Sequence, residues 1–375
     1  MKPVWVGLGL VGWLALGQSG GGSWQTLALL SEPRQEVGVA EVNGEIYVAG
    51  GFLAGGETSD KLEAYAPAEN RWRTLSPLPV AVNHPAAVGL NGKLYVLGGY
   101  QSPQGLAGPS NTVQVYDPAT AAWSQAVPMP SARGGLTAVV LDGKIYAVGG
   151  AGGPSLGDFA VFDPGGNTWT ALPAMLTPRD HTGAATIAGK IYVVGGRNQR
   201  SFTLNTLEVY DPQTRKWAAL APMPTGRSGH AVAALGNCLY AFGGEGNRQS
   251  PAGTFPQVEV YSVRTGKWSS LANMPTPRHG IAAATLSGKI YLPAGAWEQW
   301  RTTRSSPRPL APTRRTASSR VFLSTQVWRF RGEDKCVSVS VCPRLNAAGS
   351  AGFFAFDVGR RQGYSLSSPS RLERL

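Results

Sequence analysis

The chain has 375 residues and a formal net charge of +12, with 49 Gly, 28 Pro and only three Cys. So few cysteines exclude a disulfide-rich scaffold. Residues 1–295 hold 20 Lys+Arg against 17 Asp+Glu, whereas residues 296–375 hold 14 against 5, so the positive charge belongs to the C-terminal part and we expect no specific nucleic-acid partner.

The first 17 residues have the form of a secretory signal peptide. Met1 and Lys2 precede an apolar stretch from Val4 to Leu16 that is too short to span a membrane as a helix. No Cys follows this stretch to carry a lipid. We expect cleavage after residues 1–17, a flexible leader at 18–23, and a secreted or periplasmic protein without a membrane anchor. The alternative is a disordered or buried amino terminus.

A six-fold repeat occupies most of the chain, with a period of 46–51 residues. Each copy begins with a Trp, and ten residues later comes a fixed position, here called the Arg slot. A Gly-Gly pair follows sixteen residues after the slot. The Trp residues are 24, 72, 123, 169, 217 and 268, and the slots are Arg34, Val82, Arg133, Arg179, Arg227 and Arg278. The pairs begin at Gly50, Gly98, Gly149, Gly195 and Gly243, with Ala294-Gly295 as a sixth, altered copy. Repeats of this length are typical of propeller blades.

Each repeat predicts four short strands. In the fourth copy, residues 183–187 are a small-residue run, and residues 190–196 alternate in hydrophobicity and are rich in β-branched residues. The third strand ends in an aromatic residue seven positions before the next Trp, and the fourth strand carries that Trp. No segment has a sustained helical period.

The order Gly-Gly, Tyr-Asp-Pro, Trp and Pro-x-x-Arg resembles the Kelch-repeat family over residues 24–331. The resemblance implies an all-β, six-bladed Kelch β-propeller of four-stranded antiparallel blades. The last copy supplies strands at 281–285, 289–292 and 324–330, but it has no fourth strand. We expect residues 24–30 to fill that place, so that an N-terminal strand closes the last blade and covers two sheet edges.

The C-terminal part interrupts the repeat. An Arg/Pro/Ser-rich insertion at about 297–320 lies within the sixth copy, and three interpretations remain open: a solvated disordered loop, an arm that binds polyanions, or a reading-frame artefact. We expect residues 332–375 to be a poorly ordered tail. Cys336 and Cys342 could pair, and Cys238 is expected to pack as a small apolar side chain.

The Kelch resemblance implies that the mouth of the channel is formed by residues just after each Arg slot and by the loops after Gly-Gly. The leading prediction is a non-catalytic recognition module, expected to be monomeric, that binds a protein or a glycan ligand at this mouth. The candidate ligand-binding residues are Glu36, Asn83, His84, Tyr100, Asp180, His181, Arg197, Asn198, Ser228, Glu245, Arg248 and His279.

Three histidines, His84, His181 and His279, follow slots of alternate copies and could converge on the propeller axis as metal ligands. His279 is offset by one position, and neighbouring residues on a strand point to opposite sides. We therefore expect hydrogen-bonding histidines, no metal and no cofactor. Copper chemistry like that of galactose oxidase, which is similar in fold, is not expected, because only Cys238 beside Tyr240 suggests its ligand set.

A second enzyme family, the sialic acid mutarotases (N-acetylneuraminate epimerases), provides the alternative function. Gly243-Gly244-Glu245 with Arg248 shortly downstream is similar to the segment that carries their proposed acting residues. The resemblance implies that Glu245 would shuttle the anomeric proton while Arg248 binds the sugar carboxylate. The opposing interpretation is a surface Glu–Arg pair in a loop, worth little energy.

Overall fold

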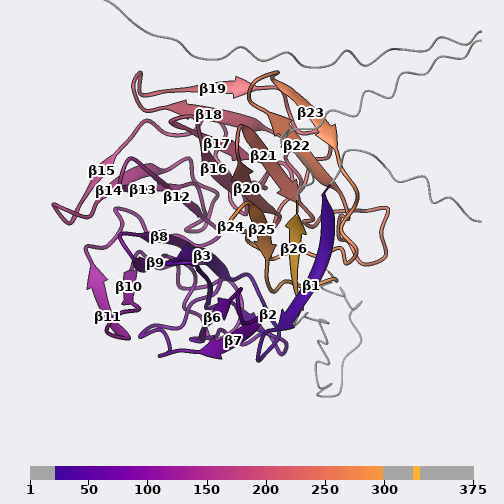
Figure 1. Cartoon of the computed structure of the whole chain (residues 1–375). Helices are drawn as coiled ribbons and strands as arrows, with labels where there is room; N and C mark the ends of the chain where they lie inside the picture. The colour runs from indigo at the N-terminus through magenta and orange to yellow at the C-terminus, as the bar shows by residue number, and fades with distance from the viewer. Residues whose placement is uncertain (1–21, 299–323, 330–375) are drawn as a thin grey trace, which may run out of the picture. The chain divides into compact units, whose positions relative to one another are not determined.

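The computed structural model describes residues 22–298 and 324–329, and these residues contain 26 strands. Six four-stranded antiparallel sheets are arranged around a central axis, as Figure 1 shows. Each sheet is one blade. The described residues form no helix, so none of them offers a helical membrane span. The all-β, six-bladed propeller expected from the sequence is confirmed.

Within each blade the strands run in order from the axis outward. Blade one consists of β3 (Gly38–Val42), β4 (Glu45–Ala49), β6 (Leu62–Ala66) and β7 (Arg71–Thr74). Blade two consists of β8 (Ala86–Leu90), β9 (Lys93–Leu97), β10 (Val113–Asp117) and β11 (Ala122–Ala126). Blade three consists of β12 (Thr137–Leu141), β13 (Lys144–Val148), β14 (Phe159–Asp163) and β15 (Thr168–Ala171).

The other three blades repeat this order. Blade four consists of β16 (Gly183–Ile187), β17 (Lys190–Val194), β18 (Leu207–Asp211) and β19 (Lys216–Leu220). Blade five consists of β20 (Ala231–Leu235), β21 (Cys238–Phe242), β22 (Val258–Ser262) and β23 (Lys267–Ser270). Blade six consists of β24 (Ala284–Leu286), β25 (Lys289–Leu292), β26 (Ser324–Arg329) and β1 (Ser23–Leu29). A short pair, β2 (Arg34–Gln35) with β5 (Phe52–Leu53), completes the strands.

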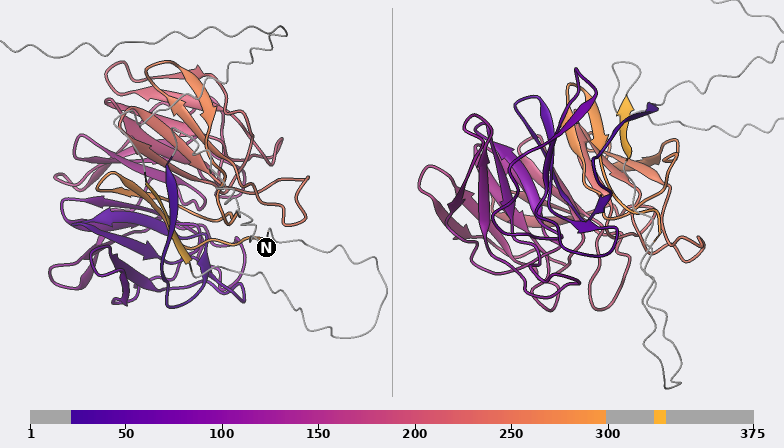
Figure 2. Two further views of the ribbon diagram at one scale, coloured as in Figure 1. Left: turned by 45° about the vertical axis from the view of Figure 1, so that its right-hand side comes forward. Right: turned by 90° about the horizontal axis from the view of Figure 1, so that it is seen from below.

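The N-terminal strand closes blade six, as expected. β1 pairs antiparallel with β26, placing Trp24 opposite Trp328, and Figure 2 shows the indigo β1 beside the yellow-orange β26. The innermost strand of blade six starts later than the sequence predicted: β24 begins at Ala284 and not at Ile281. Extending its register would place Ala282 opposite Pro293, which has no N–H to donate, so pairing stops short of that point.

The repeated Trp residues join neighbouring blades. The indole N–H of Trp72 donates to the carbonyl of Ala28 in β1 at 3.1 Å, and that of Trp123 donates to the carbonyl of Ser76 at 3.0 Å. Trp169, Trp217 and Trp268 make the equivalent bonds. Each Trp ring also packs on the aromatic residue of its own third strand, with centroids 5.1–5.3 Å apart. The indoles therefore fill and bridge the space between blades.

The Gly-Gly pairs allow the blades to approach closely. At Gly98 (φ 62°) an added Cβ would lie 2.4 Å from the carbonyl oxygen of Arg133, the slot of the next blade. The five slot arginines are almost fully buried and bind backbone carbonyls of their own blade; Arg34, for example, donates to the carbonyls of Gly50 and Lys61. The slot arginines therefore stabilise the propeller fold.

Several sequence-based predictions concern residues that the structure does not describe. The signal peptide, most of the leader, nearly all of the insertion and the C-terminal tail lie outside the described residues. Cys238 is buried in β21, as expected, but it is also disulfide-bonded, which the sequence analysis did not predict. Cys336 and Cys342, which could pair according to the sequence, both lie outside the described residues.

Candidate functional site

A closed ring of backbone hydrogen bonds surrounds the propeller axis. It is formed by the residue two positions after each slot. Each N–H donates to the carbonyl of the equivalent residue in the preceding blade at 2.8–3.0 Å. All six residues have a left-handed backbone, with φ between 50° and 62°. The six are Glu36, His84, Gly135, His181, Gly229 and Gly280.

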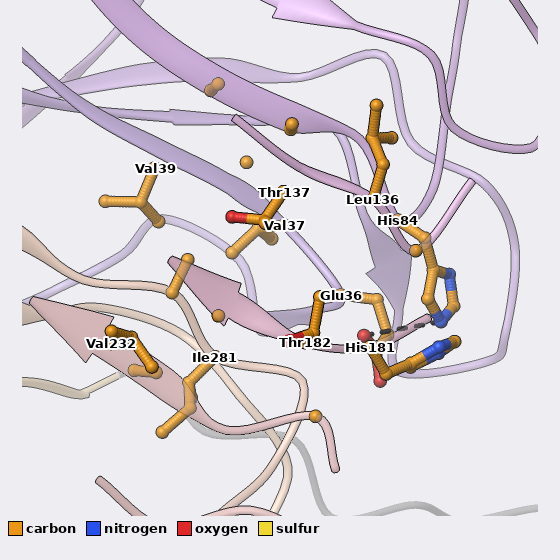
Figure 3. Close-up of a pocket in the computed structure, with 18 of the residues that line it drawn as sticks. Glu36, Val37, Val39, His84, Leu136, Thr137, His181, Thr182, Val232 and Ile281 are labelled. Carbon is orange, nitrogen blue, oxygen red and sulfur yellow. Dashed lines mark ion pairs between the residues drawn. The ribbon is translucent and has the colours of Figure 1, made fainter. Parts of the chain in front are cut away.

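Three side chains of this ring meet on one side of the axis. In Figure 3 the carboxylate of Glu36 lies beside the imidazoles of His84 and His181. The Nε2 atom of His84 lies 3.3 Å from a carboxylate oxygen of Glu36, and the two imidazole centroids are 4.8 Å apart. The glycine of blade three, Gly135, leaves the space between the two histidines free of a further side chain.

Residues from the adjoining positions extend this group into a belt around the axis. Arg197 donates to the Nε2 atom of His181 and to the carboxylate of Glu245, both at 2.8 Å. The imidazole of His279 lies 3.7 Å from the carboxylate of Glu245 and 3.6 Å from that of Glu36. We call these groups the axial belt: Glu36, His84, His181, Arg197, Glu245 and His279.

Two further predicted residues hold the belt histidines from behind. The Nδ1 atom of His84 bonds to the side-chain oxygen of Asn83 at 2.7 Å, and that of His181 bonds to a carboxylate oxygen of Asp180 at 2.6 Å. Asp180 also accepts from Arg197 at 3.1 Å. These contacts fix the ring orientations, so that Nε2 of His84 faces Glu36 and Nε2 of His181 faces Arg197.

Burial and neighbouring charges shift the pKa values of the belt residues in opposite directions. Burial alone would raise the pKa of Glu36, but the histidines around it, His84 foremost, lower that pKa well below its usual range. Burial lowers the pKa of His84 to about 3. At His279, burial is outweighed by the carboxylates of Glu245 and Glu36, which raise the pKa to about 8. At neutral pH Glu36 is therefore ionised, His84 is neutral and His279 is largely protonated.

The first strands of the blades line a cavity of about 140 Å³ that extends from the ring into the channel. Its wall combines apolar side chains such as Val37, Leu136, Val232 and Ile281 with polar ones such as Thr137 and Thr182, as Figure 3 shows. Pockets for organic ligands are usually about 300–1,000 Å³, so the channel is too small for an organic ligand of typical size. A larger ligand would bind at the mouth, where the belt is reached from the loops.

The other predicted site residues lie around the belt. The hydroxyl of Tyr100 donates to the carbonyl of Ala151, and Ser228 donates to Glu245 at 3.4 Å. The side-chain oxygen of Asn198 accepts from the backbone N–H groups of Arg200 and Ser201 in its own loop, and its amide nitrogen donates to the carbonyl of Pro178. Arg248 is exposed on the blade-five loop and is not the partner of Glu245. Instead, Arg197 reaches Glu245 from the neighbouring blade. That Glu245 and Arg248 act together on a sugar stays a prediction.

Several further residues of the mouth were not predicted from the sequence. Thr58 accepts from the amide of Asn83, and the hydroxyl of Ser155 donates to the carboxylate of Asp180. Two loop residues, Leu106 and Phe202, are 50% and 41% exposed, and the guanidinium of Arg197 lies 5.0 Å from the centroid of the Phe202 ring. All four lie in loops whose length varies between repeats, so no repeated position marked them.

Comparison with known proteins decides the family. A model of the KLHDC2/KLHL20/DRC7 Kelch-repeats domain matches residues 23–178 and 173–295, well over half of the chain. The chain belongs to the Kelch-repeat family. A solved structure, "Structure of YjhT", is similar to this Kelch propeller, with a TM-score of 0.61 and 18% identity over 72% of this chain and 93% of that one. At this identity the likeness shows the fold alone.

Curated Kelch proteins are similar over parts of their length. The Kelch-like protein terF of Aspergillus terreus is 33% identical over 296 residues, which cover 73% of this chain and 64% of terF. The Kelch repeat and BTB domain-containing protein 1 of cowpox virus is 32% identical over 27% of this chain and 18% of its own length. The mouse Kelch-like protein 35 is 28% identical over 34% of this chain and 21% of its own length. The chain therefore spans only part of each of these relatives. The Kelch fold and these Kelch relatives support a protein-interaction module.

Proposed function

We propose that this Kelch propeller is a non-catalytic recognition module that binds a protein partner at the channel mouth. The observation that carries the proposal is the pairing of Arg197 with Phe202 on a mouth loop. Contacts to Asp180, His181 and Glu245 hold the Arg197 guanidinium in place, while its side chain remains 19% exposed. Arginine and aromatic side chains are both enriched at the cores of protein interfaces.

The mouth offers both apolar and charged groups to a protein ligand. Leu106 adds a second exposed apolar side chain on the blade-two loop. The belt contains both carboxylates and cations, so it could accept a charged side chain of either sign after one internal pair opens. Such an arrangement provides an apolar contact and a polar anchor within one surface.

Selection of peptides from a random displayed library on the purified, untagged chain tests the proposal. We expect selected peptides to bind Phe202→Ser and Leu106→Ser at least about tenfold more weakly, because exposed apolar anchors carry much of such binding energy. Leu29→Ser is the matched control, since Leu29 is 54% exposed at the end of β1, the outermost strand of blade six. Equal binding by all three variants, or no selected peptides together with binding on a glycan array, would reject a protein partner.

A sugar mutarotase is the second candidate, favoured by the Glu245–Arg197 pair. Glu245 is only 5% exposed and accepts from Arg197 at 2.8 Å, which places a carboxylate and a guanidinium side by side at the mouth. NMR of sialic acid anomer exchange tests this function. Acceleration by the wild-type chain and by Arg248→Ala, lost in Glu245→Gln, would support it; an unchanged exchange rate on adding the wild-type chain would remove it.

We also propose that the protein is exported from the cytoplasm. The signal-like residues 1–17 predict a secreted or periplasmic protein. Amino-terminal sequencing of the protein recovered from outside the cytoplasm would support export if the chain began near Gln18. Recovery of the protein only inside the cell with Met1 intact would contradict it.

A further inference from the structure

Glu36, His84 and His181 converge at the mouth from blades one, two and four. Each offers one potential ligand atom, and these three atoms all lie within 4.8 Å of one another. We propose that the three residues form a binding site for a divalent transition metal such as Zn²⁺. This set differs from the three histidines that the sequence suggested as metal ligands. The carboxylate of Glu36 takes the place of His279.

The hydrogen bonds around His84 determine which ring nitrogen is available. The amide nitrogen of Asn83 donates to the hydroxyl of Thr58 and to the carbonyl of Gly105. The amide oxygen of Asn83 must therefore face Nδ1 of His84, and that nitrogen must carry the hydrogen. Nε2 of His84 then faces the carboxylate of Glu36, 3.3 Å away. A cation between these two atoms, either a proton or a metal ion, would be attracted by both.

His181 is held in the same way. Its Nδ1–H donates to the carboxylate of Asp180, which itself accepts from Ser155 and Arg197. A histidine that donates one ring N–H to a carboxylate or amide oxygen while the other nitrogen faces a metal is the usual arrangement around protein-bound zinc. Both imidazoles of the set therefore have fixed orientation and a directed Nε2 lone pair.

The distances and the ligand types favour a transition metal. Zinc binds at about 2.0–2.2 Å from nitrogen and oxygen ligands, so neighbouring ligand atoms in a tetrahedral site lie about 3.4 Å apart. The Glu36–His84 pair already has this spacing, and His181 would need to approach by roughly an ångström. Two imidazoles make Ca²⁺ and Mg²⁺ poor candidates, since both prefer oxygen ligands. Three protein ligands leave a fourth position open toward the mouth.

Arg197 competes with the metal. Its Nη2 atom donates to Nε2 of His181 at 2.8 Å. A bound cation would displace this bond, while Arg197 keeps Asp180 through Nε and Glu245 through Nη1. Because Arg197 competes with the metal, removing its guanidinium should strengthen metal binding. A belt with a purely structural role would show no such effect.

Titration calorimetry of the untagged full chain with Zn²⁺, after treatment with a chelator and dialysis, tests the site. We expect one Zn²⁺ per chain, and visible absorption of bound Co²⁺ as an independent signature. The variants His84→Gln and His181→Gln should reduce binding to background. His230→Gln is the matched control, since His230 is a buried histidine outside the ligand set and its loss should leave binding unchanged.

Two further variants keep the test decisive if the histidine variants fail to fold, which circular dichroism of the metal-free proteins would reveal. Asn83→Ala should weaken Zn²⁺ binding by about 10–100-fold, as loss of an orienting partner usually does. Arg197→Gln should strengthen it by at least about tenfold, because a nearby positive charge is removed. No stoichiometric binding by the wild-type chain, or equal affinity of wild type, Asn83→Ala and Arg197→Gln, would overturn the proposal.

Discussion

At the scale of single residues, three of the five slot arginines are paired with the third strand of the same blade. Arg34, Arg179 and Arg227 each face a buried glutamate of the third strand. In blade two the slot is Val82, and the third strand carries Gln114, whose amide is satisfied by the backbone of Val80. A carboxylate is thus buried at this position only where an arginine neutralises it, as the cost of burying a lone charge requires.

This pattern predicts the effect of replacing one slot. Arg179→Val should lower the free energy of unfolding by about 3–5 kcal/mol, because the carboxylate of Glu208 would remain buried without its partner. The double variant with Glu208→Gln copies blade two and should recover more than half of the loss. Urea unfolding monitored by tryptophan fluorescence measures both changes. A double variant no more stable than the single one would show that the ion pair is not the reason for the slot.

Arg133 offers a comparison within the same chain. Its carboxylate partner, Asp158, lies at 3.5 Å and has a side chain that is 45% exposed. Water can solvate Asp158 after the arginine is removed, so Arg133→Val should cost clearly less than Arg179→Val. Equal losses would point to packing of the arginine stem, which both variants remove.

His230 provides a pH-dependent prediction outside the belt. Burial, aided by the nearby charge of Arg227, lowers the pKa of His230 to about 3, whereas histidine in an unfolded chain titrates near about 6.5. Between these values the unfolded chain binds a proton that the folded chain does not, so stability falls as the pH falls below 6.5. At pH 5 the loss is about 2 kcal/mol.

The variant His230→Gln isolates this contribution. Its free energy of unfolding should change less between pH 7 and pH 5 than that of the wild type, by about 2 kcal/mol. Urea unfolding curves at the two pH values provide the measurement. Parallel pH dependence of the two proteins would mean that His230 is protonated as easily in the folded state as in the unfolded one.

At the scale of elements, β1 has more neighbours than its position at the end of the chain would suggest. Trp24 packs against Phe242 of blade five and Trp328 of its own blade, with centroids 6.0 and 4.8 Å apart. The carbonyl of Ala28 accepts the indole N–H of Trp72 in blade one. β1 therefore joins blade six to both of its neighbours.

A pair of truncations tests the role of β1. Removing residues 1–29 should lower the melting temperature and promote aggregation, because the edge of β26 and the indole of Trp72 would lose their partners. Removing residues 1–21 leaves β1 complete and is the control. Scanning calorimetry with light scattering would record both effects. Equal melting temperatures for the two truncated chains would show that the ring does not depend on β1.

Most strands could be predicted from the sequence, because the landmarks that mark them are also the residues that join the blades. The Trp, Gly-Gly and aromatic positions recur in register and define each four-stranded unit. The short β2–β5 pair was not predicted, since two-residue strands leave no periodic pattern. The late start of β24 was missed because Pro293 acts through its partner strand, a relation that appears only once the register is known.

At the scale of the whole molecule, the belt depends on which residues the ring brings together. The sequence predicted all six belt residues as mouth residues, because each follows a slot or a Gly-Gly pair. It did not predict their contacts. Arg197 reaches Glu245 across a blade boundary, and His279 turns toward two carboxylates and away from the other histidines. Such contacts are set by side-chain length and rotamer, which repeat spacing does not encode.

Ring closure determines whether this belt can exist, and hydrogen exchange of the six axial amides tests closure directly. In a closed six-bladed ring each of these N–H groups donates to the preceding blade, so residue-resolved NMR should find all six strongly protected. The decisive bonds are the two at blade six, Gly280 to Gly229 and Glu36 to Gly280. Rapid exchange at Glu36 and Gly280 with protection elsewhere would mean that blade six does not close the ring, and the belt described above would not form.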